Sequence, residues 1–249
     1  MAKYVIEDTT LTNMADAIRE KTGGTEPITP SNFATEIAGI QSGGDTTIED
    51  GLVEGTLTEY SNDRVTNVGE YAFYHTTISK IDLPNVTSVK KMAFQSSFVQ
   101  SLNLPKATSI GETSCGWCSS LQQINIPNVI SIDKTAFRQT SLPSITLPKV
   151  TNVANDAFYE NENLKSVDFY SKVTIATHAF VFCSVLETVI LRSETMCTLS
   201  GIGVFSSTPI ESGTGYIYVP DNLVDSYKSA TNWSTYASQI KPISELEEN

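Results

Sequence analysis

The sequence lacks long apolar runs. No stretch of its 249 residues approaches 18 consecutive apolar positions, which excludes a transmembrane helix. The first residues, MAKYVIEDTTLTNMADAIREKTGG, show no basic start followed by an apolar run, so they do not form a secretory signal. Neither end carries a lipid-anchor motif. We therefore expect no membrane insertion, and we expect the protein to fold in the cytoplasm of the cell that makes it.

Basic side chains are also few. The chain has 16 Lys and Arg against 28 Asp and Glu, for a net charge of −12. Residues 61–205 carry eleven of each sign and are neutral, whereas residues 1–60 carry −8 and residues 206–249 carry −4. Nucleic-acid binding needs a basic face, so we expect no nucleic-acid partner. Acidic ends of this kind are typical of segments that keep a protein soluble.

An internal repeat is present, and such repeats decide the fold of a chain. An Ala-Phe pair recurs along the sequence, with Ser114-Cys115 in the same place in the third unit. An apolar residue followed by Pro forms a second marker, and both markers recur in steps of 21 or 22 along the numbering. The residues at the Phe position of the six units, which are the predicted repeat core, are Phe73, Phe94, Cys115, Phe137, Phe158 and Phe180.

The difference between the shorter and the longer units arises in one turn. The next aliphatic residue follows the Phe position after five residues in the units of Phe73, Phe94 and Phe137. It follows after six residues in the units of Cys115, Phe158 and Phe180. Repeat solenoids tolerate this variation because each unit contacts only its neighbours.

Each unit contains two short segments with the alternation of β-strands. In Ile78-Ser-Lys-Ile81-Asp-Leu83-Pro84, Ile81 and Leu83 are predicted to point inward, and the Pro ends the strand because it has no amide hydrogen. The second segment, as in Val86-Thr-Ser-Val89, is again β-branched and alternating. One unit cannot bury its apolar face alone, so stacked units are expected to share a continuous core.

The run VTSVKKMAFQSSFVQSLNLPKATSIGETSCGWCSSLQQINIP resembles the BspA-like, or Treponema-type, leucine-rich repeat. The resemblance covers about residues 60–220 and implies a mainly β solenoid of about six repeats. The segment YIYVPDNLVDSYKSATNWSTYASQIKPI looks like the closing segment of such proteins. The apolar residues that are expected to cover the last coil as a C-terminal cap are Leu223, Tyr227, Trp233, Tyr236 and Ile240.

Residues 1–44 do not share the repeat. Apolar residues at helical spacing and two Gly-Gly stops predict two short helices there, too short to be stable alone. The pattern LTNMADAIREKTGGTEPITPSNFATEIAGI resembles an N-terminal module of phage and prophage tail structural proteins of Gram-positive bacteria. The alternative is a helical hairpin that caps the solenoid.

The chain therefore divides into four parts. The predicted parts are a helical docking or oligomerisation module at 1–44, a linker or N-terminal cap strand at 45–59, repeats at 60–205, and a C-terminal cap with an acidic tail at 206–249.

The motif Cys115-Gly-Trp-Cys118 invites a redox interpretation. The repeat register favours a structural one, because Cys115 replaces a core Phe. Cys118 falls in a column that is expected to bond backbone groups of the turn, as at the Asn/Cys position of leucine-rich repeats. The other members of this column are Thr76, Ser97, Thr140, Asn161 and Cys183.

The sequence shows no arrangement typical of a metal or catalytic site. His75 and His178 lie at different repeat phases about five coils apart, so they cannot share an ion with the two cysteines. Asp82 and Asp168 share an outward column but are four units apart, too far for a glycosidase pair. We found no phosphate-binding glycine loop and no nucleophilic serine motif. We therefore expect a non-enzymatic protein with no cofactor and no metal.

The outward strand positions form polar columns without Trp, Tyr or Arg, the residues that dominate protein-binding hot spots. The connecting turns offer better candidates. The predicted binding surface consists of Tyr71, Tyr74, His75 and Trp117.

These features lead to a hypothesis about function. The main interpretation is a virion structural protein of a phage or prophage tail, baseplate or fibre, which displays its solenoid for host-surface attachment. Its partners would be other virion proteins through residues 1–44 and a host cell-surface protein or glycan. A homotrimer follows from analogy with phage fibres alone. The alternative is a BspA-like bacterial cell-surface adhesin or a protein-interaction module.

Overall fold

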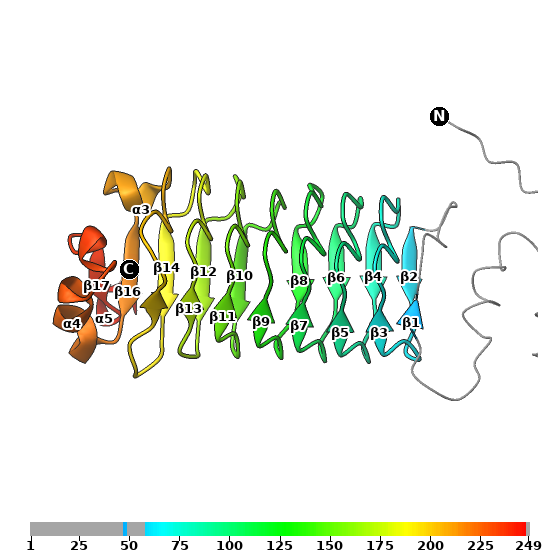
Figure 1. Ribbon diagram of the computed structural model, residues 1–249, viewed down its shortest axis with the longest axis horizontal. Helices are drawn as coiled ribbons and strands as arrows, with labels where there is room; N and C mark the ends of the chain where they lie inside the picture. The colour runs from blue at the N-terminus through cyan, green and yellow to red at the C-terminus, as the bar shows by residue number, and fades with distance from the viewer. Residues whose placement is uncertain (1–46, 49–57, 248–249) are drawn as a thin grey trace, which may run out of the picture. The chain divides into compact units, whose positions relative to one another are not determined.

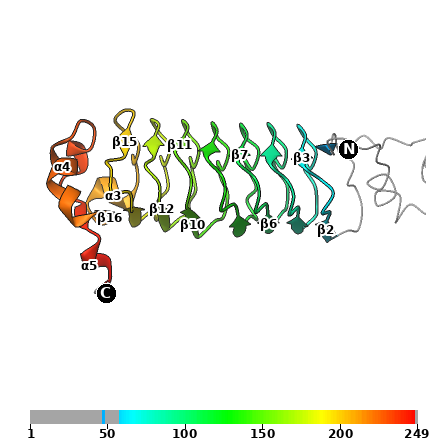
Figure 2. The same ribbon diagram turned by 90° about the horizontal axis from the view of Figure 1, so that it is seen from below.

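The computed structural model describes residues 47–48 and 58–247, which form a parallel β-solenoid (Figure 1). The described residues belong to one unit of the chain, Thr47–Asn249. The two helices predicted within residues 1–44 lie outside the described residues. Each coil of the solenoid crosses two sheets that face one another, as the turned view in Figure 2 shows.

One sheet has eight strands, each two residues long, and every strand pairs in parallel with its counterpart in the next coil. In spatial order the strands are β1 (Thr47–Ile48), β3 (Asn67–Val68), β5 (Ser88–Val89), β7 (Ser109–Ile110), β9 (Ser131–Ile132), β11 (Asn152–Val153), β13 (Thr174–Ile175) and β15 (Thr198–Leu199).

The opposite side of the solenoid is divided into a sheet of four strands and a sheet of five. The first contains β2 (Glu59–Ser61), β4 (Lys80–Asp82), β6 (Ser101–Asn103) and β8 (Gln123–Asn125). The second contains β10 (Ser144–Leu147), β12 (Ser166–Phe169), β14 (Thr188–Leu191), β16 (Tyr216–Val219) and β17 (Ile240–Pro242).

Strand register follows the sequence repeat, which confirms the prediction of a mainly β solenoid whose coils correspond to the repeat units. Ile81 pairs with Leu102, and Val89 pairs with Ile110, so equivalent residues stack from coil to coil. The inward positions are buried and most outward ones are polar, with Ile190 and Tyr218 as apolar and aromatic exceptions in β14 and β16. A parallel solenoid buries its apolar face only by stacking, so each coil depends on its neighbours.

Pro143 gives a physical reason for the division between β8 and β10. At the equivalent position of the preceding coil, the Gln122 amide donates to the carbonyl of Gln100 (3.0 Å), and later in the chain the Lys165 amide donates to Pro143 (2.9 Å). Pro143 itself has no amide hydrogen, so it cannot donate to the coil before it. Within the described residues β8 and β10 are accordingly not paired, and the sheet restarts at β10.

The Phe position fills the core at the turn that leads from one sheet to the other. Phe137, Phe158 and Phe180 stack with ring centroids 5.3 and 5.1 Å apart, and all the predicted core residues are buried. Phe205 continues the stack, 5.6 Å from Phe180, as a seventh member that the sequence did not predict. The step from Phe180 to Phe205 is longer than the earlier steps, so a search for steps of 21 or 22 missed it.

The backbone on both sides of the Phe position adopts a left-handed conformation. In every coil from the Phe73 coil to the Phe205 coil, the residues two before and two after this position have positive φ, from 53° to 76°. This geometry directs alternate amides along the solenoid, so that Phe73 donates to the carbonyl of Ala93 (2.7 Å) and His75 to that of Gln95 (3.1 Å). The turns thus form a third hydrogen-bonded column between coils.

Left-handed backbone is costly for residues other than glycine, which makes a stabilising substitution predictable. Ser96 has a φ of 55°. The Ser96→Gly variant is expected to have an unfolding free energy about 0.5–1 kcal/mol higher than the wild type, because Gly removes the clash of the Cβ atom. Urea unfolding measures this change. The matched control is Ser101→Gly in the extended strand β6, where the substitution should instead lose about 0.5–1 kcal/mol. Equal effects at both sites would contradict the prediction.

The C-terminal residues close the last coil, as the sequence predicted. Tyr227, Trp233, Tyr236 and Ile240 are buried, and Leu223 is half-buried. The Tyr227 hydroxyl accepts from the amide of Cys197 (2.7 Å), and the Trp233 indole donates to the carbonyl of the same residue (3.0 Å). The helical elements of this part are α3 (Pro209–Ser212), η1 (Asp221–Leu223), α4 (Val224–Ser229), η2 (Ser234–Tyr236) and α5 (Ser244–Glu247).

Candidate functional site

The cysteines lie in the core, which argues against redox chemistry. Cys115 and Cys118 are free thiols with no exposed surface. Burial raises the pKa of Cys118 to about 11, and burial together with the neighbouring Cys118 raises the pKa of Cys115 well above its ordinary value. Because the thiolate is the reactive form, these thiols are poorly suited to disulfide exchange at neutral pH.

The column that contains Cys118 bonds the backbone of the turns. The Cys118 thiol contacts the carbonyl of Phe94 (2.9 Å), and the Cys183 thiol contacts that of Phe158 (3.1 Å). Asn161 donates to the carbonyl of Phe137 (2.6 Å) and accepts from both the amide and the hydroxyl of Thr140. The side chain of one coil therefore satisfies a buried backbone group of the preceding coil.

The two histidines lie in separate surroundings. His178 Nδ1 lies 3.9 Å from a carboxylate oxygen of Asp156, whereas His75 packs against Tyr74. In the part of the chain that the structure describes, no three His, Cys, Asp or Glu residues are grouped as they would be around a metal ion. No helix among the same residues is long and apolar enough to cross a membrane.

Three of the four predicted binding residues lie together on one turn. The rings of Tyr71 and Tyr74 meet edge to face at 5.7 Å, and the His75 ring lies 4.2 Å from that of Tyr74. Trp117 belongs to a turn two coils farther along the solenoid and to another group of side chains. The predicted binding residues therefore lie in two separate clusters, one around Tyr74 and one around Trp117.

Trp117 begins a row of side chains that crosses four consecutive coils. The Arg138 guanidinium lies between two aromatic rings, 5.1 Å from the ring centroid of Trp117 and 4.7 Å from that of Tyr159. Tyr159 in turn meets Phe182 edge to face at 5.5 Å. We call Trp117, Arg138, Tyr159 and Phe182 the aromatic row. Its members contact one another by cation–π and ring interactions, which hold the exposed rings of Trp117 and Phe182 in place.

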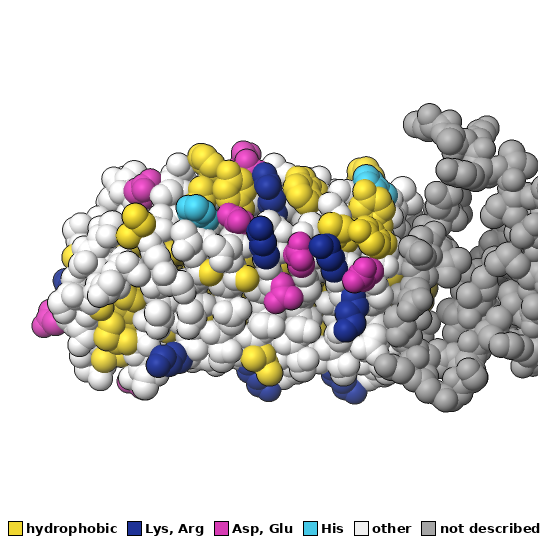
Figure 3. All heavy atoms as spheres, viewed as in Figure 1, with side chains coloured by type: hydrophobic (Ala, Val, Ile, Leu, Met, Phe, Trp, Pro, Cys, Tyr) yellow, Lys and Arg dark blue, Asp and Glu magenta, His cyan; other side chains and the backbone are white. Residues whose placement is uncertain are grey.

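Glu160 anchors the aromatic row. Its carboxylate accepts from Arg138 Nη2 at 2.8 Å, and both side chains are about 30% exposed (31% and 29%). In the space-filling view of Figure 3, large apolar and charged side chains gather in the upper half of the face. The lower half of that face carries fewer of them.

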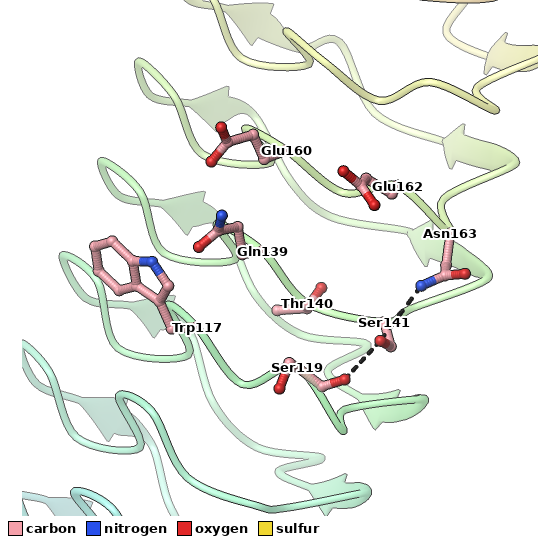
Figure 4. Close-up of a pocket in the computed structure, with 8 residues that line it drawn as sticks. All are labelled: Trp117, Ser119, Gln139, Thr140, Ser141, Glu160, Glu162 and Asn163. Atoms are coloured by element: carbon pink, nitrogen blue, oxygen red, sulfur yellow. Dashed lines mark hydrogen bonds between the residues drawn. The ribbon is translucent and has the colours of Figure 1, made fainter.

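A polar cleft opens beside Trp117, with a volume of about 370 Å³ (Figure 4). Indole, amide, hydroxyl and carboxylate groups from three consecutive coils line it. These groups belong to Trp117, Gln139, Ser141, Glu160, Glu162 and Asn163. Along one side of the cleft, the Ser141 hydroxyl donates to the carbonyl of Ser119 (2.6 Å) and accepts from the Asn163 amide (3.4 Å).

A family model decides the classification of the chain. The model of the BspA type leucine rich repeat region, which itself describes six copies of the repeat, matches residues 56–127 and 108–232. These two matches cover well over half of the sequence. The chain belongs to the BspA-type leucine-rich-repeat family. The predicted resemblance of residues 60–220 to this family is thereby confirmed.

Solved leucine-rich-repeat structures are similar to this BspA-type chain at low identity. A leucine rich cell surface protein from Faecalibacterium prausnitzii is 20% identical, with a TM-score of 0.42, over 71% of this chain and 69% of that chain. The pneumococcal vaccine antigen PcpA is 13% identical, with a TM-score of 0.39, over 67% and 63%. A leucine-rich repeat protein from Bacteroides ovatus is 16% identical, with a TM-score of 0.24, over 70% and 65%. No protein with a curated description matches the chain.

The BspA-type register contains the signal that would have found the rest of the aromatic row. Arg138 and Tyr159 directly follow the Phe position, and Trp117 and Phe182 come two residues after it. These two columns of the repeat hold three aromatic residues and one arginine in four consecutive units.

Proposed function

We propose that this BspA-type protein is a non-enzymatic recognition protein that attaches to a cell surface through the turns of its solenoid. The aromatic row is the observation that carries the proposal. Trp, Tyr and Arg are the residues enriched in binding hot spots, and here they are held by one another and by Glu160. A rigid exposed side chain loses little conformational entropy when a partner binds, which favours affinity.

The polar faces of the sheets support the same assignment by contrast. Outward positions of the strands carry ladders such as Asp82, Asn103 and Asn125, whose side chains already hydrogen-bond one another at 2.6 and 2.7 Å. Such groups have little unsatisfied bonding capacity to offer a partner. BspA-type solenoids are typically non-enzymatic, which agrees with a role in binding.

Cell binding by matched variants tests the proposal. Labelled full-length protein is incubated with a panel of intact Gram-positive and mammalian cells, and the retained label is measured. Tyr159→Ala combined with Phe182→Ala should lower retention at least about tenfold, as expected for loss of hot-spot side chains. Thr146→Ala on the exposed face of β10 is the control and should bind like the wild type. Circular dichroism checks that both variants are folded. Equal binding by both variants, or no binding by the wild type, would refute the proposal.

A tail-attachment role in a phage or prophage is a second candidate. The resemblance of residues 11–40 to tail-associated modules favours it, and these residues would dock other virion proteins or form a trimer. The role predicts that full-length protein co-sediments with phage particles, whereas residues 47–249 do not. A truncated form that co-sediments as well as the full-length chain would contradict docking through this segment.

A further inference from the structure

The cleft beside Trp117 lies at an irregularity of the repeat. The Phe137 coil reaches its next aliphatic residue, Leu142, after five residues, and the coils on both sides need six. Within the units from Phe73 to Phe180, this is the only short turn that lies between two long ones. The middle coil therefore has one residue fewer to cover the surface, and its neighbours form the walls of a notch. Figure 4 shows the lining side chains on three successive coils.

The chemistry of the walls points to a ligand rich in hydroxyl groups. Trp117 supplies an indole that is 37% exposed, a surface on which the C–H face of a sugar ring can stack. Gln139 and Asn163 supply amides that both donate and accept, and Glu160 and Glu162 supply acceptors. The pyranose ring of a saccharide has this same combination of an apolar face and hydroxyls around its edge.

Charge restricts the class of saccharide. The charge of Glu160 is balanced by Arg138 at 2.8 Å, and the carboxylate of Glu162 is exposed. The cleft therefore presents net negative charge, which repels carboxylated and sulfated sugars. The hydroxyl groups of a neutral saccharide can donate hydrogen bonds to these carboxylates without electrostatic repulsion. The cleft volume lies at the lower end of the ~300–1,000 Å³ typical of small-molecule sites and suits about one or two sugar rings.

A peptide is a poorer match for the same cleft. Peptides are usually bound by a free strand edge or by an apolar groove. In the middle coil of the cleft, the Ser141 amide already donates to the carbonyl of Leu121 (3.1 Å), and the Thr140 amide already donates to Asn161. These backbone groups cannot pair with an added strand. The lining is mixed and polar, which suits hydroxyl groups better than apolar side chains.

From this geometry we infer that the cleft formed by Trp117, Gln139, Ser141, Glu160, Glu162 and Asn163 binds a neutral saccharide unit of a cell-surface glycan. The inference deepens the proposed function and rests on it, since it assigns a ligand class to one end of the aromatic row. Stacking on Trp117 positions the ring, and Glu162 and Asn163 bond its hydroxyls.

Tryptophan fluorescence of the full-length protein provides a direct test. The chain has two tryptophans, and Trp233 is buried in the C-terminal cap, so a ligand in the cleft changes the emission of Trp117. The probes are methyl glycosides of glucose, galactose, mannose and N-acetylglucosamine and their β-linked and α-linked di- and trisaccharides, with sialyllactose as an acidic comparison. At least one neutral probe should shift the emission saturably, and sialyllactose should not.

Two variants separate the cleft from the rest of the solenoid. Ser141→Tyr fills the notch and leaves Trp117 in place. It should weaken the affinity for the neutral saccharide that binds the wild type at least tenfold. Glu162→Gln keeps the shape of the cleft but removes the charge, and it should weaken the affinity for the same neutral saccharide several-fold. Thr146→Ala, on the exposed face of β10, is the control and should leave the affinity unchanged. Calorimetry with the same probe checks the variants without relying on fluorescence.

The outcomes distinguish failure of the ligand class from failure of the function. If no neutral probe binds, or if Ser141→Tyr binds as tightly as the wild type, the saccharide inference is wrong. If cell binding then persists and is abolished by protease treatment of the cells and not by periodate, the partner is a protein and the proposed function stands. If a neutral probe binds in the cleft but no cell is bound, the proposed attachment role fails and the saccharide site stands.

Discussion

Phe158→Ala is expected to lower the free energy of unfolding by about 3–5 kcal/mol, the range found when a buried Phe is truncated to Ala. The ring is fully buried between two others, with centroids 5.3 Å from Phe137 and 5.1 Å from Phe180. Its removal leaves a cavity and breaks two stacked contacts at once. Because each coil is supported only by its neighbours, the loss falls in the middle of the array. Urea unfolding followed by circular dichroism measures the effect.

Phe98→Ala is the matched control for this prediction. Phe98 lies in a turn with 58% of its surface exposed, so the same substitution should change the unfolding free energy by less than about 0.5 kcal/mol. Loss of a similar amount of stability in both variants would show that the stack does not support the solenoid in the way that its geometry suggests.

Asn161→Ala is expected to cost about 3 kcal/mol, even though the residue is polar and its deletion leaves a small cavity. The side chain is fully buried, and it satisfies the carbonyl of Phe137 and the amide and hydroxyl of Thr140. Without it, these groups stay buried with no partner, and each costs about 1–3 kcal/mol before any relaxation. The measurement is again urea unfolding.

The repeat itself supplies a graded control. Asn161→Cys introduces the residue found in the same column at Cys118 and Cys183, whose thiols contact the carbonyl of the preceding Phe position. This variant should restore the bond to Phe137 but not the bond from the Thr140 amide, so its loss should be about 1–2 kcal/mol. Asn163→Ala, exposed at the cleft, should cost less than about 0.5 kcal/mol. An Asn161→Cys variant as unstable as Asn161→Ala would argue against the role of the column.

Most of the fold could be predicted from the sequence, because a solenoid repeats one local pattern. The inward alternation at Ile81 and Leu83 and the Phe at the turn recur in phase, so a single unit predicts the next. The same register correctly assigned Cys115 to the core, where the structure finds a buried thiol. Phe205 was missed because a longer coil shifted it out of phase.

The surface was predicted only in part. Trp117 was selected as an exposed aromatic residue in a turn, and the structure places it two coils away from the other candidates, Tyr71 and Tyr74. Its actual partners are Arg138 and Tyr159. A side chain in a turn can lean toward either neighbouring coil, and the sequence pattern does not state which way it leans.

The sequence by itself determined the solenoid, its repeat length and the identity of its core, because these follow from periodic burial of apolar residues. It also contained the alternation of five-residue and six-residue turns and the proline at 143. Only the tertiary structure decided what these irregularities do. The shorter turn after Phe137 leaves a cleft only because longer turns are stacked on both sides of it. The missing amide hydrogen of Pro143 divides a sheet only because the strands of successive coils pair with one another. Both effects depend on contacts between equivalent positions of successive repeat units.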